Sequence, residues 1–529
     1  MRLGQVLEGV KLKFPLSPEL AGVDIAGIEY DSRRVGKGFV FFAFAGSRVD
    51  GRRFAEDAAA RGAVAFVSEG AARSGTSGAA GLSPEAGWIE VEHGRRALAI
   101  ASRNFYDCPD ERMGFTGITG TNGKTTTSYL LDGILREAGF VTGLIGTIES
   151  RLAGERREAV NTTPESLDIM RFAAELEQRA SSHPAALTME VSSHALALGR
   201  VFGIRFHTAV FTNITRDHLD FHHTMEQYAA AKRLLFRPED FPAPEWAVFN
   251  YEDPASDAMA GKARHELWYG VDFNAQLRAQ RIRSGFDGLR FEMRYEGARQ
   301  PIESALIGHI NVMNILAASG AAISYGIDLP TIARGIAGCT AVPGRFERID
   351  EGQPFLVAVD YAHTDDALRN AIQIARELVT PGLTKTGMPT TGAGTGETAR
   401  GRVITLFGCG GDRDRSKRPL MGMAAGEMSD YVVLTSDNPR SEDPLDIMND
   451  ALVGLGRFDT PYAVEPDRAK AIHRALKEAR AGDAVLIAGK GHETYQVLKD
   501  RTIPFDDREV ARETLRSMGF KKHGGRESE

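Results

Sequence analysis

The sequence predicts an α/β protein of three domains. Its 529 residues correspond to roughly three domains of ~150 residues each. From about Gly114 onward, apolar strand-like runs alternate with helix-like segments, which is typical of a mostly parallel, doubly wound sheet. The alternation restarts after residues 342–350 and indicates a second, Rossmann-like domain. We therefore expect domains at residues 1–110, 111–341 and 342–529.

Short strands between Gly-rich turns predict the separate α/β domain at the N-terminus. The apolar runs 38–46 and 63–70 are expected to be buried strands, and the stretch 52–62 between them has a helical pattern.

Bulk composition excludes several functional classes. With 64 Lys and Arg residues against 71 Asp and Glu residues, the chain has no overall basic field for nucleic acid or an anionic membrane. An anionic substrate would need a local basic pocket. Cys108, Cys339 and Cys409 have neither metal-ligand nor disulfide spacing. No run approaches the ~18 apolar residues of a spanning helix, and no signal peptide is visible, so we expect a cytoplasmic protein.

The stretch 114–135 carries the first chemical signal. An apolar strand leads into a helix through a loop that reads Gly120, Thr121, Asn122, Gly123, Lys124, Thr125, Thr126. A strand, a glycine turn and a helix N-terminus form the context in which backbone N–H groups and the helix dipole hold a phosphate. The strict pattern wants a glycine at Ile118, so an ordinary βα turn is the alternative. The context favours nucleotide binding, with Lys124 on the β and γ phosphates and Thr125 on Mg²⁺.

Two further sites in the middle domain carry polar side chains at strand ends, where parallel sheets bind ligands. Glu190 closes the apolar run 185–191, and a carboxylate there rarely serves packing alone. The loop after the next strand offers oxygen and imidazole ligands: Asp217, His218, Asp220, His222 and His223. A solvated charged loop is the alternative. Lys232, in the helical stretch 228–236, has the neighbours of a surface lysine whose head reaches water.

The last domain contains one segment with almost nothing to bury. Residues 380–402 are rich in Gly, Thr and Pro, and we expect a flexible surface insertion without an assigned function. The Gly408–Gly411 run is a poor match to a dinucleotide fingerprint, because Arg413 occupies the position of the third glycine. Cys409, at a strand end, is expected to pack rather than react.

Motifs along nearly the whole chain resemble those of the Mur ligases of peptidoglycan synthesis. In chain order they read GTNGKTTT, MEVSSHAL, TNITRDHLDFH, YAAAKRLLF, GHINVMNILAA, VPGRFE, VDYAHTDDAL, FGCGGDRDRSKRPLM, DNPRSEDP and GKGHETYQ. An ordered set of this kind is far more specific than any single motif. The phosphate loop of this family looks like a shortened form, so the resemblance also accounts for Ile118.

The resemblance implies an ATP-dependent ligase that adds meso-2,6-diaminopimelate to UDP-N-acetylmuramoyl-L-alanyl-D-glutamate. ATP would convert the terminal carboxylate of the dipeptide into an acyl phosphate, and the incoming amine would then expel phosphate. The N-terminal domain would bind the UDP-sugar, the central domain ATP, and the C-terminal domain the amino acid. We expect closure of the last domain on the central one, which would protect the acyl phosphate from water. The partners would be small molecules only, and the protein a monomer.

The resemblance also implies the residues of the ATP and metal sites. The catalytic residues would be Lys124, Glu190, His218 and Lys232. ATP would be bound by Gly120, Thr121, Asn122, Gly123, Lys124, Thr125, Thr126, Asn311 and Arg345, with Asp360 nearby. Mg²⁺ would be bound by Thr125, Glu190, His218 and Lys232. Lys232 matches a lysine that CO₂ carbamylates in this family, which turns a cation into a carboxylate-like ligand and replaces the surface-lysine interpretation.

The two remaining substrates have their own matching positions. UDP-N-acetylmuramoyl-dipeptide would be bound by Ser32, Thr162, Thr163, Ser192 and Arg200. Diaminopimelate would be bound by Arg413, Asp437, Asn438, Pro439, Arg440, Gly489 and Glu493. Two arginines, Arg413 and Arg440, can clamp a distal carboxylate, which L-lysine lacks. Gly489 and Glu493 would then recognise the distal ammonium.

Three alternatives remain at this stage. The same ligase could add L-lysine, although a lysine site would leave the guanidinium of Arg440 without its carboxylate. A folate polyglutamate ligase would share the ATPase core but not the Asp31–Arg33 turn or the Thr162–Thr163 pair. A non-catalytic nucleotide-binding regulator would be expected to lose Lys124 or its catalytic partners, and this chain keeps them.

Overall fold

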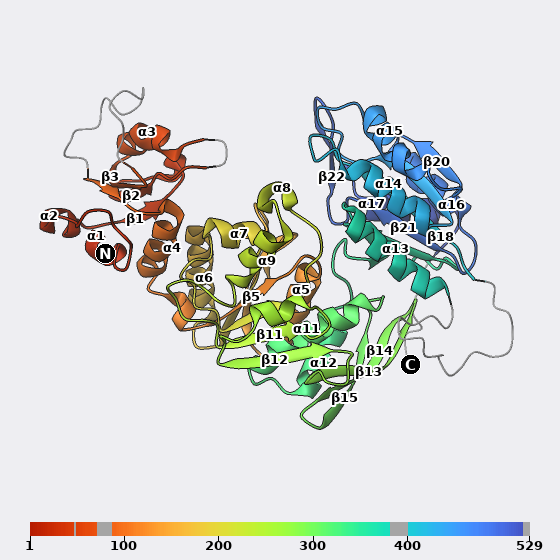
Figure 1. Cartoon of the computed structure of the whole chain (residues 1–529), viewed down its shortest axis with the longest axis horizontal. Coiled ribbons are helices and arrows are strands. Elements are labelled where there is room, and N and C mark those ends of the chain that lie inside the picture. Colours follow the sequence, from red (N-terminus) through yellow and green to blue (C-terminus); the bar gives the residue numbers. More distant parts are fainter. Residues whose placement is uncertain (47–48, 71–86, 381–399, 522–529) are drawn as a thin grey trace. The chain divides into compact units, whose positions relative to one another are not determined.

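The computed structural model describes residues 1–46, 49–70, 87–380 and 400–521 (Figure 1). The chain divides into two compact units, Met1–Leu277 with Ala317–Gly335, and Arg278–Leu316 with Ile336–Glu529. Of the predicted insertion 380–402, residues 381–399 lie outside the described residues. Among the helices that the structure describes, none is long and apolar enough to cross a bilayer. The three predicted domain boundaries stay a prediction.

A four-stranded parallel sheet of order β1-β2-β3-β4 forms the N-terminal part of the first unit. Its strands are β1 (Gly27–Glu29), β2 (Phe39–Phe42), β3 (Ala63–Ser68) and β4 (Gly87–Glu90). Alternate residues of β2 face opposite sides: Val40 packs in a cluster with Leu98, whereas Phe41 packs in another with Ala58. The strands predicted at 38–46 and 63–70 are confirmed as β2 and β3.

The central sheet of the first unit is mostly parallel, as predicted. Its strands follow the order β12-β11-β10-β5-β9-β6-β7-β8. They are β5 (Gly114–Thr119), β6 (Val141–Ile145), β7 (Glu149–Leu152), β8 (Glu155–Glu158), β9 (Ala185–Glu190), β10 (Thr208–Phe211), β11 (Trp246–Asn250) and β12 (His265–Gly270). The strands from β12 to β6 are parallel, so the carboxyl ends of β5, β9 and β10 meet at one edge.

The structure contains antiparallel strands that the sequence did not predict. The hairpin β7–β8 continues the central sheet. Strands β13 (Leu277–Gly285), β14 (Gly288–Tyr295) and β15 (Ala298–Ser304), which belong to the second unit except for Leu277, form an antiparallel meander. Their sequences are rich in arginine and glutamate and lack the continuous apolar run of a buried parallel strand. A half-exposed antiparallel strand needs no such run.

A six-stranded sheet of order β16-β17-β21-β18-β19-β20 forms the core of the second unit. Its strands are β16 (Glu347–Arg348), β17 (Leu356–Asp360), β18 (Val403–Cys409), β19 (Tyr431–Ser436), β20 (Tyr462–Glu465) and β21 (Ala484–Ala488). A separate two-stranded sheet is formed by β22 (Tyr495–Val497) and β23 (Thr502–Pro504). All pairs from β17 to β20 are parallel, whereas the edge strand β16 is antiparallel.

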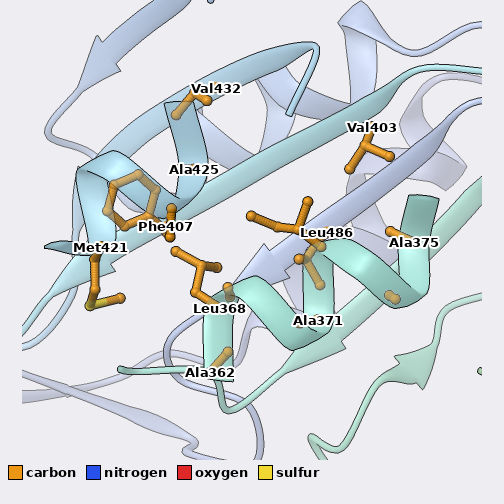
Figure 2. Close-up of a cluster of buried hydrophobic side chains, with 14 of the residues drawn as sticks. Ala362, Leu368, Ala371, Ala375, Val403, Phe407, Met421, Ala425, Val432 and Leu486 are labelled. Atoms are coloured by element: carbon orange, nitrogen blue, oxygen red, sulfur yellow. The ribbon is translucent and has the colours of Figure 1, made fainter. Parts of the chain in front are cut away.

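Both faces of this sheet are covered, as a doubly wound domain requires. On one face, Leu368 and Ala371 of α13 (Asp365–Val379) pack in a cluster with Phe407 and Leu486 of the strands (Figure 2). On the other, the helices α16 (Arg468–Glu478) and α17 (Asp507–Ser517) pack in a second cluster with alternate strand residues such as Val485. The Rossmann-like prediction for this domain is therefore confirmed.

The remaining helices connect these strands. In the first unit they are α1 (Leu3–Val6), α2 (Pro18–Ala21), α3 (Ala55–Ala60), α4 (Gly94–Phe105), α5 (Lys124–Glu137), α6 (Ser166–Ala180), α7 (Ser193–Leu198), α8 (Leu219–His222), α9 (Met225–Arg233) and α10 (Ala255–Met259). The second unit adds α14 (Lys417–Met428) and α15 (Pro444–Leu455), while α11 (Ile310–Ser324) and α12 (Leu329–Gly338) contain residues of both units.

Candidate functional site

The predicted phosphate loop lies between β5 and α5, which begins at Lys124. Its two glycines have backbone angles that favour glycine, with φ of +152° at Gly120 and +88° at Gly123. A Cβ at Gly120 would lie 1.9 Å from Thr212 Oγ1, so the loop passes directly against the end of β10. Lys124 folds back over the loop, and its Nζ donates to the carbonyls of Gly120 (2.9 Å) and Thr121 (2.8 Å).

Glu190 lies fully buried at the end of β9, where three groups donate to it. Thr125 Oγ1 donates to Oε2 (3.0 Å), while the N–H of Thr147 donates to Oε1 (2.8 Å) and its hydroxyl to Oε2 (3.0 Å). The carboxylate is therefore joined to the first turn of α5 and to the turn after β6. Sequence reasoning missed Thr147, and its position two residues after an apolar strand was the available signal.

Lys232 is buried rather than exposed, which corrects the interpretation drawn from its neighbours alone. Its Nζ donates to the carbonyl of Gly120 (2.8 Å) and lies 4.5 Å from the ring centroid of Tyr228, one turn earlier on α9. Burial lowers the pKa of this ammonium well below its usual value, and the positive charge of Lys124 lowers it further. Two lysines thus donate to one loop carbonyl.

His218 precedes α8 with an unusual left-handed backbone (φ +54°). Its Nε2 lies 3.4 Å from Asp217 Oδ2, and its ring packs edge-on against His194 and Tyr228. Burial lowers the pKa of His218 to about 4, with Asp217 opposing the shift and His194 adding to it. The ring is therefore neutral at pH 7 and has a lone pair for a ligand. Among the described residues, no group of three or more His, Cys, Asp or Glu has the geometry of a metal site.

Four of the five predicted dipeptide-binding residues lie around the end of β9, where Glu190 is located. Thr163 Oγ1 donates to the backbone carbonyl of Glu190 (2.8 Å) and accepts from the N–H of Ser192 (3.0 Å). Arg200 Nη1 donates to the carbonyl of Thr163 (2.9 Å). The Thr162 hydroxyl lies 3.1 Å from that of Thr147. The structure therefore brings Thr162, Thr163, Ser192 and Arg200 into one group around the end of β9.

A carboxylate that sequence reasoning missed holds Arg200. Glu165 Oε1 lies 3.1 Å from Arg200 Nε and 3.3 Å from Nε of Arg95 on α4. Glu165 directly follows the Thr162–Thr163 pair and Pro164, and this adjacency was the available signal.

Ser32 lies apart from this group, in a 3-10 turn (Ser32–Arg34) of the N-terminal sheet domain. It is buried, and the carboxylate of Asp31 accepts from the N–H of Arg33 (3.1 Å) to close the turn. Tyr30, just before the turn, donates its hydroxyl to Asp168 of α6 (2.5 Å).

In the second unit, the predicted ATP residues lie at two places. The buried Asn311 donates from Nδ2 to the carbonyl of Ile307 (2.8 Å). The guanidinium of Arg345 lies 4.9 Å from the ring centroid of Tyr361. Burial raises the pKa of the neighbouring Asp360, and Arg345 opposes that shift.

The predicted diaminopimelate residues converge where β19 and β21 end. Asn438 Nδ2 donates to Glu493 Oε2 (2.9 Å). A Cβ at Gly489 would lie 2.6 Å from Asp437 Oδ2, so these two segments touch. Arg440 has a left-handed backbone (φ +52°) and donates from Nη1 to the carbonyl of Gly411 (2.7 Å).

The loop after β18 completes this group. A Cβ at Gly410 would lie 3.0 Å from Arg440 Nη1 and 3.7 Å from Arg413 Cγ, so both arginines border Gly410. A Cβ at Gly411 would lie 1.9 Å from the carbonyl oxygen of Pro439. The side chain of Cys409 is buried next to Met421, and burial raises its thiol pKa to about 12, which suits packing rather than nucleophilic chemistry.

Three family models match this chain. They are the Mur ligase family catalytic domain at residues 24–106, the Mur ligase middle domain at 118–322, and the Mur ligase glutamate ligase domain at 344–491.

Whole-length relatives agree with these models. The chain is 60% identical over 524 residues to the UDP-N-acetylmuramoyl-L-alanyl-D-glutamate--2,6-diaminopimelate ligase of Solibacter usitatus, covering 98% of this chain and 99% of that protein. It is 44% identical to the protein of the same name from Geobacillus thermodenitrificans, covering 93% and 95%. A solved structure of a ligase with this name matches with a TM-score of 0.66 and 29% identity, covering 98% of this chain and all of that one.

Proposed function

This chain belongs to the Mur ligase family, and we propose that it is an ATP-dependent ligase that adds meso-2,6-diaminopimelate to UDP-N-acetylmuramoyl-L-alanyl-D-glutamate. Relatives of that name at 60% and 44% identity over nearly the whole chain support this substrate. They do not favour the L-lysine alternative. The reaction serves the synthesis of peptidoglycan precursors.

One observation carries the ligase chemistry. The side chain of Glu190 accepts from Thr125 at the phosphate loop, while its backbone carbonyl accepts from Thr163 in the predicted dipeptide site. A single residue thus borders both sites. A carboxylate can be phosphorylated only if one of its oxygens lies in line with the γ phosphate, so the two sites must adjoin.

The proposed reaction proceeds in two steps. A carboxylate oxygen of the dipeptide attacks the γ phosphorus of ATP, and ADP leaves. The neutral amine of diaminopimelate then attacks the acyl carbon and gives up a proton to water, and the tetrahedral intermediate collapses with phosphate as the leaving group. Lys124 would neutralise charge on the transferring phosphoryl group, and Arg200 would orient the dipeptide.

Two oxygen-bearing side chains of the first unit support a proposed Mg²⁺ site, although they do not by themselves form a complete ligand set. The buried Glu190 carboxylate and the Thr125 hydroxyl offer the hard oxygen ligands that this ion prefers, and the neutral His218 could join them. Bound Mg²⁺ would supply charge neutralisation for the phosphates. A protonated Lys232 would oppose a cation, whereas its carbamate would attract one. The lowered pKa of Lys232 supports this modification, because only a neutral amine adds CO₂.

In the second unit, the arginines support selection of diaminopimelate. Arg440 and Arg413 both border Gly410, and a pair of guanidinium groups can bind the distal carboxylate. Glu493, held by Asn438, would receive the distal ammonium. The amino acid must reach the acyl phosphate, so we propose that the last domain closes on the central one during the reaction.

Phosphate release tests the function directly. Purified protein is given ATP, Mg²⁺ and UDP-N-acetylmuramoyl-L-alanyl-D-glutamate, with meso-diaminopimelate, L-lysine or no amino acid in parallel. We expect sustained turnover with diaminopimelate only. Preference for L-lysine would contradict the proposal that diaminopimelate is the substrate. No turnover in any arm would favour the alternative of a non-catalytic nucleotide-binding regulator.

A variant pair tests the arginine clamp. Arg440→Ala should lower kcat/KM for diaminopimelate by about tenfold to a hundredfold, because a charge-assisted contact is lost. Arg474→Ala, an exposed arginine on α16, is the matched control and should behave like the wild type.

A further inference from the structure

Lys490 is a buried lysine that the proposed function leaves without a role. Its side chain is fully buried two residues after β21, and lysine is almost never buried without partners. Its Nζ donates to Asn438 Oδ1 (3.1 Å) and Glu493 Oε2 (3.1 Å). Both partners belong to the proposed diaminopimelate site. The ring centroid of Tyr495 lies 5.7 Å from the same nitrogen.

The contacts of Lys490 fix the orientation of the Asn438 amide. Oδ1 accepts from Lys490 and also from the N–H of Val497 (2.9 Å). The other end of the amide, Nδ2, donates to Glu493 Oε2 (2.9 Å). Turning the amide over would place its NH₂ group against two donors and its oxygen against a carboxylate. The charge on Lys490 therefore contributes to a single amide orientation.

Lys490 also fixes the carboxylate of Glu493. Lys490 and Asn438 both donate to the same oxygen, Oε2. Within the described residues, no hydrogen bond is made to Oε1, and the side chain keeps 16% of its exposure. A carboxylate can accept about four hydrogen bonds, so Oε1 retains its capacity for a cationic ligand. Oε2 therefore anchors the Glu493 side chain, while Oε1 is available to the ligand.

The two anchored residues come from different strand ends. Asn438 follows β19, whereas Lys490 and Glu493 follow β21, and β18 lies between these strands in the sheet. The lysine thus joins two segments that the sheet itself does not pair.

We propose that Lys490 is a positioning residue of the amino-acid site, which holds Asn438 and Glu493 in the orientation that receives the distal ammonium of diaminopimelate. This inference rests on the proposed function. A purely electrostatic role would act in the opposite direction, because a positive charge beside an ammonium subsite weakens the binding of that ammonium. The sign of the effect therefore separates the two roles.

The variant Lys490→Met tests the proposal, since it keeps the length of the side chain and removes the charge and the donor. We expect KM for meso-diaminopimelate to rise about tenfold or more, because charge-assisted contacts that orient the site are lost. KM for ATP and for the UDP-dipeptide should stay within about twofold of the wild type. A merely structural role would lower the folded fraction and leave all three KM values unchanged. Lys477→Met, an exposed lysine on α16, is the matched control.

A double-mutant cycle adds a second readout. If Lys490 acts through Glu493, Lys490→Met combined with Glu493→Gln should raise KM for diaminopimelate little more than Glu493→Gln alone. If Lys490→Met does not fold, Lys490→Gln takes its place in both measurements. An unchanged or lower KM for diaminopimelate, or additive effects in the cycle, would overturn the proposal. Failure of the wild type to use diaminopimelate would instead overturn the proposed function.

Discussion

The predicted phosphate-loop region of the first unit and the proposed amino-acid region of the second differ in the partners of their buried cations, Lys232 in the first and Lys490 and Arg468 in the second. In the first, Lys124 and Lys232 donate to the same carbonyl, that of Gly120. Among the residues that the structure describes, no carboxylate forms an ion pair with Lys232. In the second, Lys490 Nζ lies 3.1 Å from Glu493 Oε2, and Nη2 of the fully buried Arg468 lies 2.7 Å from Asp507 Oδ2.

This difference indicates what each region is built to do. A buried ammonium is costly unless an anion or a covalent change relieves it, so the burial of Lys232 supports the phosphate binding and the lysine modification that we propose for the first region. Paired charges are neutral as a group and have defined geometry, so the second region uses them to hold loops. Arg468 donates to the carbonyls of Ser436 and Ala488, the last residues of β19 and β21.

The largest expected effect on stability comes from breaking the buried Arg468–Asp507 ion pair of the second region. Arg468→Met should lower the free energy of unfolding by about 3–5 kcal/mol, because it leaves Asp507 buried without its partner. Urea unfolding measures the change. Arg474→Met, on the exposed side of the same helix, is the control. A loss below about 1 kcal/mol would contradict the importance of the pair.

In the first region, the main effect of losing a cation should fall on catalysis. Lys124→Ala should lower kcat by about 10²–10³-fold, because the phosphoryl group loses a preorganised positive charge. Steady-state phosphate release gives the value, and Lys262→Ala, an exposed lysine of the first unit, serves as the control. A loss smaller than about tenfold would remove Lys124 from the catalytic centre.

Acid should destabilise the second region through His492. Burial, and then Arg345, lowers the pKa of His492 from 6.5 to about 4. Because the unfolded chain takes up the proton first, the contribution is complete above pH 6.5 and is lost as pH falls toward 4. The loss between about pH 7.5 and about pH 5 should be about 2 kcal/mol.

The variant His492→Gln should flatten this part of the pH profile of unfolding, and His473→Gln, exposed on α16, should not. An identical pH profile for His492→Gln and the wild type would refute the assignment.

The smallest expected effect on stability is that of replacing Lys232. Lys232→Met should leave the free energy of unfolding unchanged or raise it by about 1 kcal/mol, because a buried ammonium without a carboxylate partner is itself costly. Activity should nevertheless fall by more than about tenfold if Lys232 holds the metal as a carbamate. Protein prepared without added bicarbonate is used for the unfolding measurement. A loss above about 2 kcal/mol would mean that Lys232 stabilises the fold, as the paired cations of the second unit do.

Much of the fold could be predicted from local patterns. Four strands of the C-terminal sheet are apolar runs in the sequence, and the structure confirms them as β17, β18, β19 and β21. The hairpin β7–β8 was missed because its residues are largely charged. Pairing with a neighbouring strand, rather than its own composition, makes that segment a strand.

The residues of the candidate site also divide into those that the sequence predicts and those that only the structure reveals. Gly120 and Gly123 could be identified from the sequence, because the turn between β5 and α5 requires backbone angles that favour glycine. Lys232 could not, since its neighbours along α9 are those of a surface helix and only the family resemblance pointed to it. Thr147 and Glu165 were missed altogether, because each acquires its role from a partner far along the chain.

By itself the sequence therefore determined the class of fold and the family and predicted the phosphate loop, because these depend on local periodicity, on ordered motifs and on glycine at fixed positions. Only the tertiary structure decided that Glu190 accepts from both Thr125 and Thr163, that Lys232 is buried beside Lys124, and that Lys490 joins Asn438 to Glu493. Burial and charge pairing are properties of contacts between distant segments, and they set the pKa values and side-chain orientations on which the chemistry depends.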